Sequence, residues 1–122
     1  MKLSEDYTLG TNIIRAYQDG VIEVNNKPYE RSLIISNTLL IPDWGVNDIN
    51  EMSDAHWQQL LEPAPEVILI GTGSNLRFPH PSSYRTAIEK GIGVEFMDSQ
   101  AACRTYNILL SEDRFVMAGI IL

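Results

Sequence analysis

The stretch that most constrains the fold is a run of aliphatic residues that ends at a glycine-rich loop. Val67-Ile68-Leu69-Ile70 is followed directly by Gly71-Thr72-Gly73. Four large aliphatic residues in succession are typical of a strand buried on both faces, as in a parallel or mixed sheet covered by helices. Because α/β folds bind ligands where strands end in such loops, the same stretch predicts the position of a site.

Short apolar runs separated by turn residues fill the first half of the chain. This pattern predicts a meander or a layer of hairpins rather than helices. The strands that we expect there cover residues 12–17, 21–24, 27–30, 32–35 and 38–41.

The second half alternates between helical and extended patterns, and short loops join the elements. We expect, in order, a helix capped by Ser53, a strand over 67–70, a helix from Ser82 or Ser83 to Lys90, a strand over 92–97, a helix from Asp98-Ser99 and a strand over 115–122. This order predicts right-handed crossovers and a mainly parallel sheet with helices on its faces. The 122 residues therefore form one α/β domain, in which we expect residues 1–11 to be a loose segment.

Several side chains have an expected environment within these elements. Ile88 faces inward from the second helix, and the amide of Asn107 in the last helix needs a partner. Glu95 alternates with apolar neighbours in a central strand, so we expect it to be partly buried and paired with Arg104 or Arg15. The final strand is expected in the interior of the sheet; the alternative is an edge that pairs with another chain.

The charge balance excludes several functional classes. Nine Lys and Arg against 16 Asp and Glu give a net charge of −7, and no basic cluster is present. General nucleic-acid binding and adsorption to anionic membranes are therefore not expected. The chain has a single cysteine, Cys103, no secretory or transit signal and no apolar run near the ~18 residues of a membrane span. We expect a cytoplasmic protein.

The glycine-rich loop does not match the known nucleotide-binding patterns. Leu76 stands where a dinucleotide fingerprint needs a third small residue, and Pro79 and Pro81 delay the entry into a helix. A P-loop would need Gly-Lys-Ser/Thr, which is absent. A turn that lets the chain leave the sheet is the favoured interpretation, and an anion or carbonyl site formed by its backbone N–H groups is the alternative.

Cys103 has two interpretations. Near the start of the last helix, and beside Arg104, its pKa could be lowered and its thiol made reactive. Cys103 also belongs to the apolar stripe of that helix, where a cysteine acts as a small hydrophobic residue. His56 and His80 have no spacing that links them to it, and no metal site or cofactor is expected.

The ordered set of motifs resembles the Mth938-like family, also called DUF498. The segments that carry the resemblance are Arg31-Ser32-Leu33-Ile34-Ile35, Trp44, Pro65 to Gly73, Phe78-Pro79, Gly91 to Glu95, Met97-Asp98 and Ala101 to Leu109. The resemblance implies a three-layer α/β fold with a central mixed sheet and additional β strands at the amino-terminal side. Relatives in eukaryotes include a mitochondrial factor for assembly of respiratory complex I.

Two functions follow as hypotheses. The first is a non-catalytic protein-binding or assembly module with a protein partner, for which the resemblance implies respiratory-complex assembly; a homo-oligomer is an alternative. The second is a small-molecule-binding protein or enzyme, with Asp43 and Trp44 as one wall of its site. The candidate ligand-binding residues are Gly71, Thr72, Gly73, Phe78, Asp98, Cys103 and Arg104.

Overall fold

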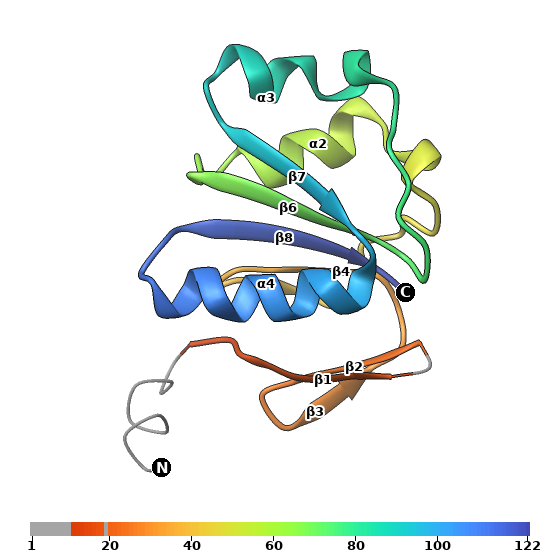
Figure 1. Cartoon of the computed structure of the whole chain (residues 1–122), viewed down its shortest axis with the longest axis vertical. Coiled ribbons are helices and arrows are strands. Elements are labelled where there is room, and N and C mark those ends of the chain that lie inside the picture. The colour runs from red at the N-terminus through yellow and green to blue at the C-terminus, as the bar shows by residue number, and fades with distance from the viewer. Residues whose placement is uncertain (1–10, 19) are drawn as a thin grey trace.

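Five strands form one mixed sheet in the computed structural model, which describes residues 11–18 and 20–122 (Figure 1). Their order is β5-β4-β8-β6-β7. The strands are β4 (Leu33–Ile35), β5 (Leu40–Ile41), β6 (Val67–Thr72), β7 (Gly93–Met97) and β8 (Val116–Ile121). β6 is parallel to β7 and β8, whereas β4 is antiparallel to β5 and β8. The expected mixed sheet is confirmed, although only half of its pairings are parallel.

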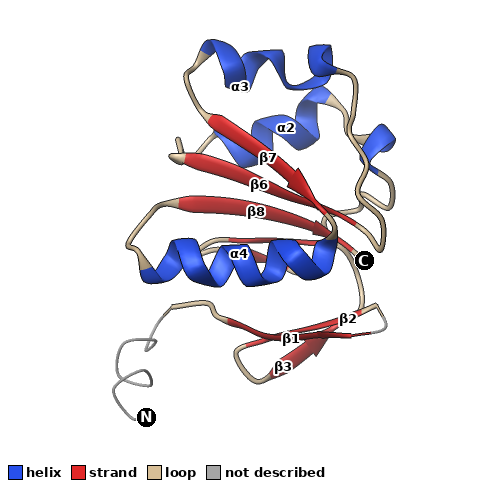
Figure 2. Ribbon diagram, in the orientation of Figure 1, coloured by secondary structure: helices blue, strands red, loops and turns tan. Residues whose placement is uncertain are grey.

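Helices cover both faces of this sheet, as Figure 2 shows. On one face, α2 (Asp54–Leu61) and α3 (Arg85–Glu89) share a core with alternate residues of β6, including Ile68 and Ile70. On the other face, α4 (Ser99–Ser111) packs on Val67 and Leu69. β6 is buried along its whole length, as its aliphatic run predicts. The three-layer arrangement is confirmed.

A separate antiparallel sheet lies on the outer side of α4 (Figure 1). It consists of β1 (Ile14–Gln18), β2 (Val21–Val24) and β3 (Lys27–Tyr29). Ile14, Ile22 and Val24 belong to the same apolar core as Tyr106 and Leu110 of α4. The additional amino-terminal strands are therefore confirmed, and α4 is covered on two sides. Apart from Thr11, the expected loose segment over 1–11 lies outside the described residues.

The first and the last α-helix begin where their capping residues predict. The Ser53 hydroxyl accepts the His56 N–H at the start of α2, and the Asp98 carboxylate accepts the Ala101 N–H at the start of α4. The second helical segment is split into a 3-10 turn, η2 (Pro81–Tyr84), and α3. The expected cap at Ser82 or Ser83 is wrong, because His80 caps η2 and α3 begins after Tyr84 without a side-chain cap. Ile88 of α3 is 57% exposed, so the expectation that it faces inward is wrong. Five residues of α-helix place only Ala87 in the core.

The strand order corrects the expected place of Glu95. The last strand, β8, enters the sheet between β4 and β6, which leaves β7 at the edge. Glu95 is consequently exposed, and among the described residues it has no ion pair with Arg104 or Arg15. The interior position expected for the final strand is correct, and the alternative of a β8 edge is wrong.

Candidate functional site

The loop after β6 leaves the sheet at the edge where the parallel strands end. Gly73 has φ of +101°, a conformation that favours glycine. At Gly71 close packing leaves no room for a side chain, because a Cβ there would lie 2.8 Å from Ser99 Oγ and 3.0 Å from Ala102 Cβ. The two glycines therefore have different roles, since Gly71 allows α4 to approach β6 and Gly73 makes the turn.

Ser99 binds this loop to the start of α4 and to the end of β8. Its backbone N–H donates to the Gly73 carbonyl and its Oγ accepts the Gly73 N–H, both at 2.8 Å. The same hydroxyl donates to the Ile121 carbonyl. The backbone groups of Gly73 are thus already used within the protein and do not face a ligand.

Thr72 closes the remainder of the loop. Its Oγ1 donates to the Asn75 carbonyl at 2.7 Å and accepts the Arg77 N–H at 3.1 Å. A hollow of about 170 Å³ remains at this place, and its lining consists of Asn47, Asp48, Thr72, Gly73, Ser74, Asn75, Arg77, Ile121 and Leu122. The hollow is small for a ligand pocket, and the Asp48 and Arg77 side chains already face each other across 3.8 Å.

Asp43 and Trp44 do not form a wall of this hollow, contrary to expectation. Trp44 is buried on the face of the sheet that α2 and α3 cover, where its ring would lie 2.6 Å from a Cβ at Gly119. Asp43 pairs with Arg31 at 2.9 Å on the surface. The chain that follows Trp44 does line this hollow, but the residues that do so are Asn47 and Asp48.

Phe78 lies beside the edge strand with its side chain in solvent. It is 68% exposed, which makes it the most exposed large apolar side chain in the described part of the chain. Its ring meets Phe96 of β7 edge to face, with centroids 5.9 Å apart. Phe96 also contacts Tyr84 and Trp57, so one aromatic cluster runs from the core to the surface at β7.

The remaining candidate residues lie at two other places. Asp98 caps α4, and its carboxylate accepts the Ala101 N–H at 2.9 Å. Cys103 and Arg104, one turn further along α4, line a cavity against β1. The candidates therefore fall into three groups: the closed loop with Asp98, the exposed Phe78, and the β1–α4 cavity. Their role in binding stays a prediction.

The Cys103 thiol is not in a reactive environment. The side chain is 4% exposed, and burial raises its pKa to about 12 against the smaller opposing effect of the Arg104 guanidinium. At neutral pH the thiol is therefore protonated, which favours the interpretation as a small hydrophobic residue. In the described part of the chain, no three His, Cys, Asp or Glu side chains lie close enough to share a metal ion.

Sequence reasoning missed Ser99 and did not place Asn107. The Asn107 amide holds both backbone groups of Ile14: Oδ1 accepts the Ile14 N–H at 3.1 Å and Nδ2 donates to the Ile14 carbonyl at 2.6 Å. The expected need for a partner is thereby met. The role of Asn107 could be suspected from the sequence because it is a polar residue in an apolar helical stripe. For Ser99 the sequence offers no such feature beyond its position next to a helix cap.

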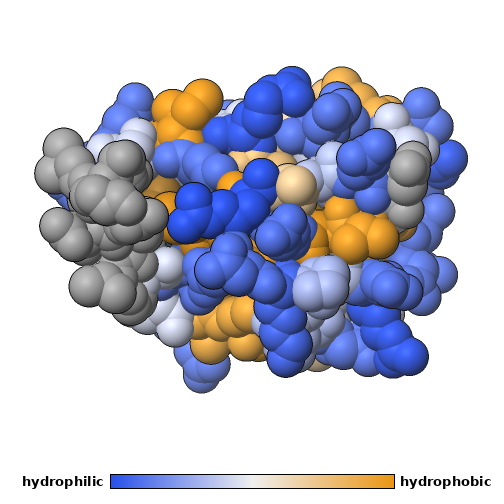
Figure 3. Space-filling view, turned by 90° about the horizontal axis from the view of Figure 1, so that it is seen from below, coloured by the Kyte–Doolittle hydropathy of each residue, from blue (hydrophilic) through white to orange (hydrophobic). Residues whose placement is uncertain are grey.

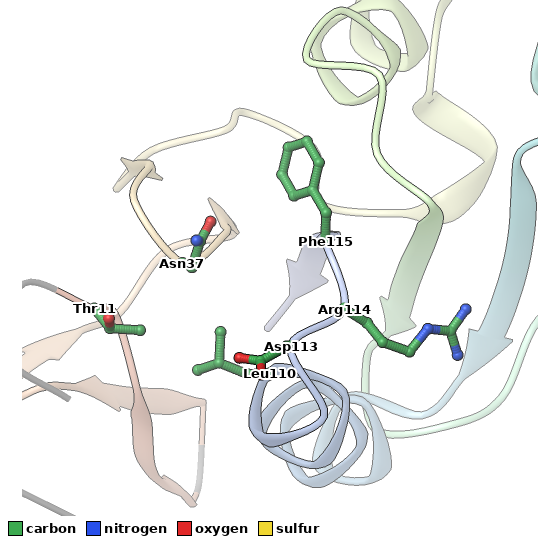
Figure 4. A pocket seen from close by; sticks show the side chains of 6 residues that line it. All are labelled: Thr11, Asn37, Leu110, Asp113, Arg114 and Phe115. Carbon is green, nitrogen blue, oxygen red and sulfur yellow. The ribbon is translucent and has the colours of Figure 1, made fainter. Parts of the chain in front are cut away.

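A further cavity of about 240 Å³ lies where α4 ends and β8 begins (Figure 4). Its lining consists of Thr11, Asn37, Leu110, Asp113, Arg114 and Phe115. The Arg114 side chain extends away from Asp113 and Asn37, so the charged groups do not converge (Figure 4). None of the candidate residues lines this cavity.

The comparisons with known proteins agree with this structure. A family model described as "Protein of unknown function (DUF498/DUF598)" matches residues 14–121. The chain belongs to this family. One relative, the "13 kDa major membrane protein" of Francisella tularensis subsp. holarctica, is 33% identical over 122 residues, which are 99% of each chain.

One further relative has a name that states a function, and another has a solved structure. The mouse "NADH dehydrogenase (ubiquinone) 1 alpha subcomplex assembly factor 3" is 32% identical over 100 residues, which are 79% of this chain and 52% of the mouse protein. The chain thus spans about half the length of that relative. A solution structure from Bordetella pertussis, described as a Mth938-like domain, superposes with a TM-score of 0.78 at 31% identity, covering 90% of this chain and 85% of that one. The Mth938-like fold is confirmed.

The name of the Francisella relative raises the question of a membrane-spanning helix. No helix in residues 11–18 and 20–122 is both long and apolar enough to cross a bilayer. Seen from the side of β1–β3, the surface is mostly hydrophilic and its hydrophobic areas are separate patches (Figure 3).

Proposed function

We propose that this DUF498 protein is a non-catalytic protein-binding or assembly module, and that its partner contacts Phe78 and the free edge of β7. The observation that carries the proposal is Phe78, a large aromatic side chain that is 68% exposed and rests on Phe96 of the edge strand. Exposed aromatic side chains are enriched where proteins bind each other, because they bury a large area at a low cost in conformational entropy.

The relatives support a role in assembly. The mouse protein is by name an assembly factor of NADH dehydrogenase, and the similar region covers most of this chain. We propose that this chain shares the general part of that role, which is the binding of other proteins. We propose assembly of a respiratory complex as its specific function. A cytoplasmic location belongs to the same proposal and rests on the single, buried cysteine and the acidic composition.

The edge of β7 indicates the class of partner. Among the described residues, β7 has a strand neighbour on one side only, so its outer backbone groups can pair with an extended segment. Glu95 is exposed at the middle of the strand. A symmetric antiparallel pairing of Gly93–Met97 with a second copy would place Glu95 opposite itself, which is destabilising. A different protein, with a basic residue opposite Glu95 and an apolar residue near Phe78, therefore fits better than a homo-oligomer.

Small-molecule binding at Gly71-Thr72-Gly73 is the second candidate and has less support. Gly73 has both backbone groups bonded to Ser99, and the Thr72 hydroxyl is used by the loop itself. A ligand would have to displace these bonds, since the adjacent hollow measures only about 170 Å³.

The experiment compares two exposed apolar positions. Affinity-tagged wild type, Phe78→Ser and Ile108→Ser are expressed in the natural host, and co-purifying proteins are quantified by mass spectrometry. Ile108 is 56% exposed on α4 and serves as the matched control. We expect wild type and Ile108→Ser to retain the same partner and Phe78→Ser to lose it. Recovery of the wild type alone, or equal retention by both variants, would contradict the proposal.

A further inference from the structure

A cavity of about 240 Å³ lies between β1 and α4, away from both the loop after β6 and the β7 edge. Its lining consists of Ile14, Arg15, Ala16, Tyr17, Gln100, Cys103, Arg104 and Asn107. The four residues from α4 are spaced i, i+3, i+4 and i+7, so they form one face of the helix. A single strand and a single helix face thus build the whole cavity.

The strand side of the cavity depends on a bulge. The register between β1 and β2 shifts between Ile14 and Ala16, so Arg15 is the residue at the irregularity. Bulges turn side chains away from the regular alternation of a strand, which is why four consecutive residues can reach one cavity. The Asn107 amide holds both backbone groups of Ile14 at 3.1 and 2.6 Å, and this fixes the bulge against α4.

Two arginines meet at this cavity without acidic partners. The ion pairs of the described residues are Arg31 with Asp43 and Arg77 with Asp48, and neither the Arg15 nor the Arg104 side chain forms a hydrogen bond with a described residue. The chain has only nine basic residues against 16 acidic ones. Two guanidinium groups from different elements, with no acidic partner among the described residues, give the cavity a local positive charge, and a bound anion would balance that charge.

The lining of the cavity also contains neutral hydrogen-bond donors. Tyr17 is half-buried beside Cys103, and its pKa is raised by burial and, to a smaller extent, by Cys103 and Asp98. Its hydroxyl therefore stays protonated at neutral pH and can donate. Gln100 supplies an amide in the same lining. Asp98 lies outside the lining, and its carboxylate is bonded to the first turn of α4.

We propose that the β1–α4 cavity binds a small oxyanion with two negative charges, held by the guanidinium groups of Arg15 and Arg104. Guanidinium forks match the oxygens of phosphate and carboxylate groups in charge and geometry. The small volume restricts the ligand to a free phosphate group or a short dicarboxylate rather than a nucleotide. This site does not depend on the protein-binding function, because Phe78 and β7 do not take part in it.

The test uses inorganic phosphate and succinate as probes, titrated separately into isotopically labelled full-length protein at constant ionic strength. Backbone amide shifts are followed by NMR for wild type, Arg15→Gln, Arg104→Gln and the double variant. Both arginines are exposed, so their replacement leaves the core intact. Arg85→Gln, on α3, is the matched control: it removes another exposed arginine, on the face of the five-stranded sheet opposite to α4.

We expect saturable shifts at Tyr17, Gln100 and Cys103 with at least one probe. The two probes distinguish a phosphate site from a carboxylate site. Each single variant should weaken the apparent affinity at least about tenfold, and the double variant should abolish saturation, because each loses a charge-assisted hydrogen bond. Arg85→Gln should bind like wild type. Absence of saturable shifts with both probes, or unchanged affinity in the double variant, would overturn the proposal.

Discussion

Ser99 and Gly73 form two reciprocal hydrogen bonds, each 2.8 Å long, between the first turn of α4 and the loop after β6. The Ser99 hydroxyl also donates to the Ile121 carbonyl at the end of β8. One fully buried side chain therefore joins the ends of two parallel strands to a helix. A loop that resembles a ligand-binding turn in sequence is, in the structure, closed by the protein's own groups.

Replacement of Ser99 should reveal how much this junction contributes to stability. Ser99→Ala leaves the Gly73 N–H and the Ile121 carbonyl without partners in a buried place, so we expect the free energy of unfolding to fall by about 1–3 kcal/mol. Urea unfolding, followed by the fluorescence of the buried Trp44 and Trp57, measures the change. Ser111→Ala is the control, since that exposed hydroxyl bonds only the Ile108 carbonyl within α4. Equal losses in both variants would contradict the assigned role.

The close approach of α4 to β6 can be tested at Gly71. In Gly71→Ala the new methyl group would lie 2.8 Å from Ser99 Oγ and 3.0 Å from Ala102 Cβ, so we expect a loss of about 1–3 kcal/mol from overpacking. Gly93→Ala is the matched control in the neighbouring strand, where the nearest atom, Val67 Cγ2, is 4.0 Å away. Thermal unfolding should separate the two variants. A Gly71→Ala protein as stable as Gly93→Ala would show that the helix can shift at no cost.

The attachment of the amino-terminal sheet depends on Asn107. Asn107→Ala removes both hydrogen bonds to Ile14, and we expect amide exchange in β1 and β2 to accelerate by about tenfold or more while β6 and β8 keep their protection. Exchange measured residue by residue by NMR tests this. Uniform acceleration throughout the chain would instead mean that the small sheet does not open separately.

The buried thiol predicts a dependence of stability on alkaline pH. The pKa of Cys103 is about 12 in the folded protein against 9.0 for the free group, so as pH rises the unfolded chain loses this proton first. Folding stability is then fully present below pH 9.0 and declines up to about 12. Cys103→Ala should lessen this decline by at most about 1.4 kcal/mol per pH unit. Chemical denaturation at neutral and alkaline pH measures the free energy of unfolding of both proteins. If it fell equally with pH in wild type and variant, this result would contradict the burial of the thiol.

Local patterns in the sequence predict the elements of this fold well. The four aliphatic residues from Val67 specify a strand that is buried throughout, and Ser53 and Asp98 mark the helix starts that the structure has. These features depend on neighbours in the chain: burial of a continuous apolar run and capping of a free N–H group. The three-layer arrangement of sheet and helices was predicted from the family resemblance rather than from these patterns.

The order of strands could not be predicted from such patterns. Glu95 lies in β7, which looks central because β6 precedes it and β8 follows it, yet β8 pairs on the far side of β6. That choice depends on contacts between distant residues, such as the packing of Trp44 over Gly119. The division of the candidate site has the same cause, because Phe78 and Cys103 are assigned to different faces only when the sheet is assembled.

The central claim is that a partner protein binds at Phe78, and site-specific photo-crosslinking in the natural host tests it most directly. A benzophenone amino acid replaces Phe78 in one variant and Ile108 in a second, and both side chains are exposed before replacement. We predict one discrete adduct from position 78, whose partner peptide carries a basic residue near an apolar one, and no such adduct from position 108. Absence of an adduct at position 78, or the same adducts from both positions, would contradict the account.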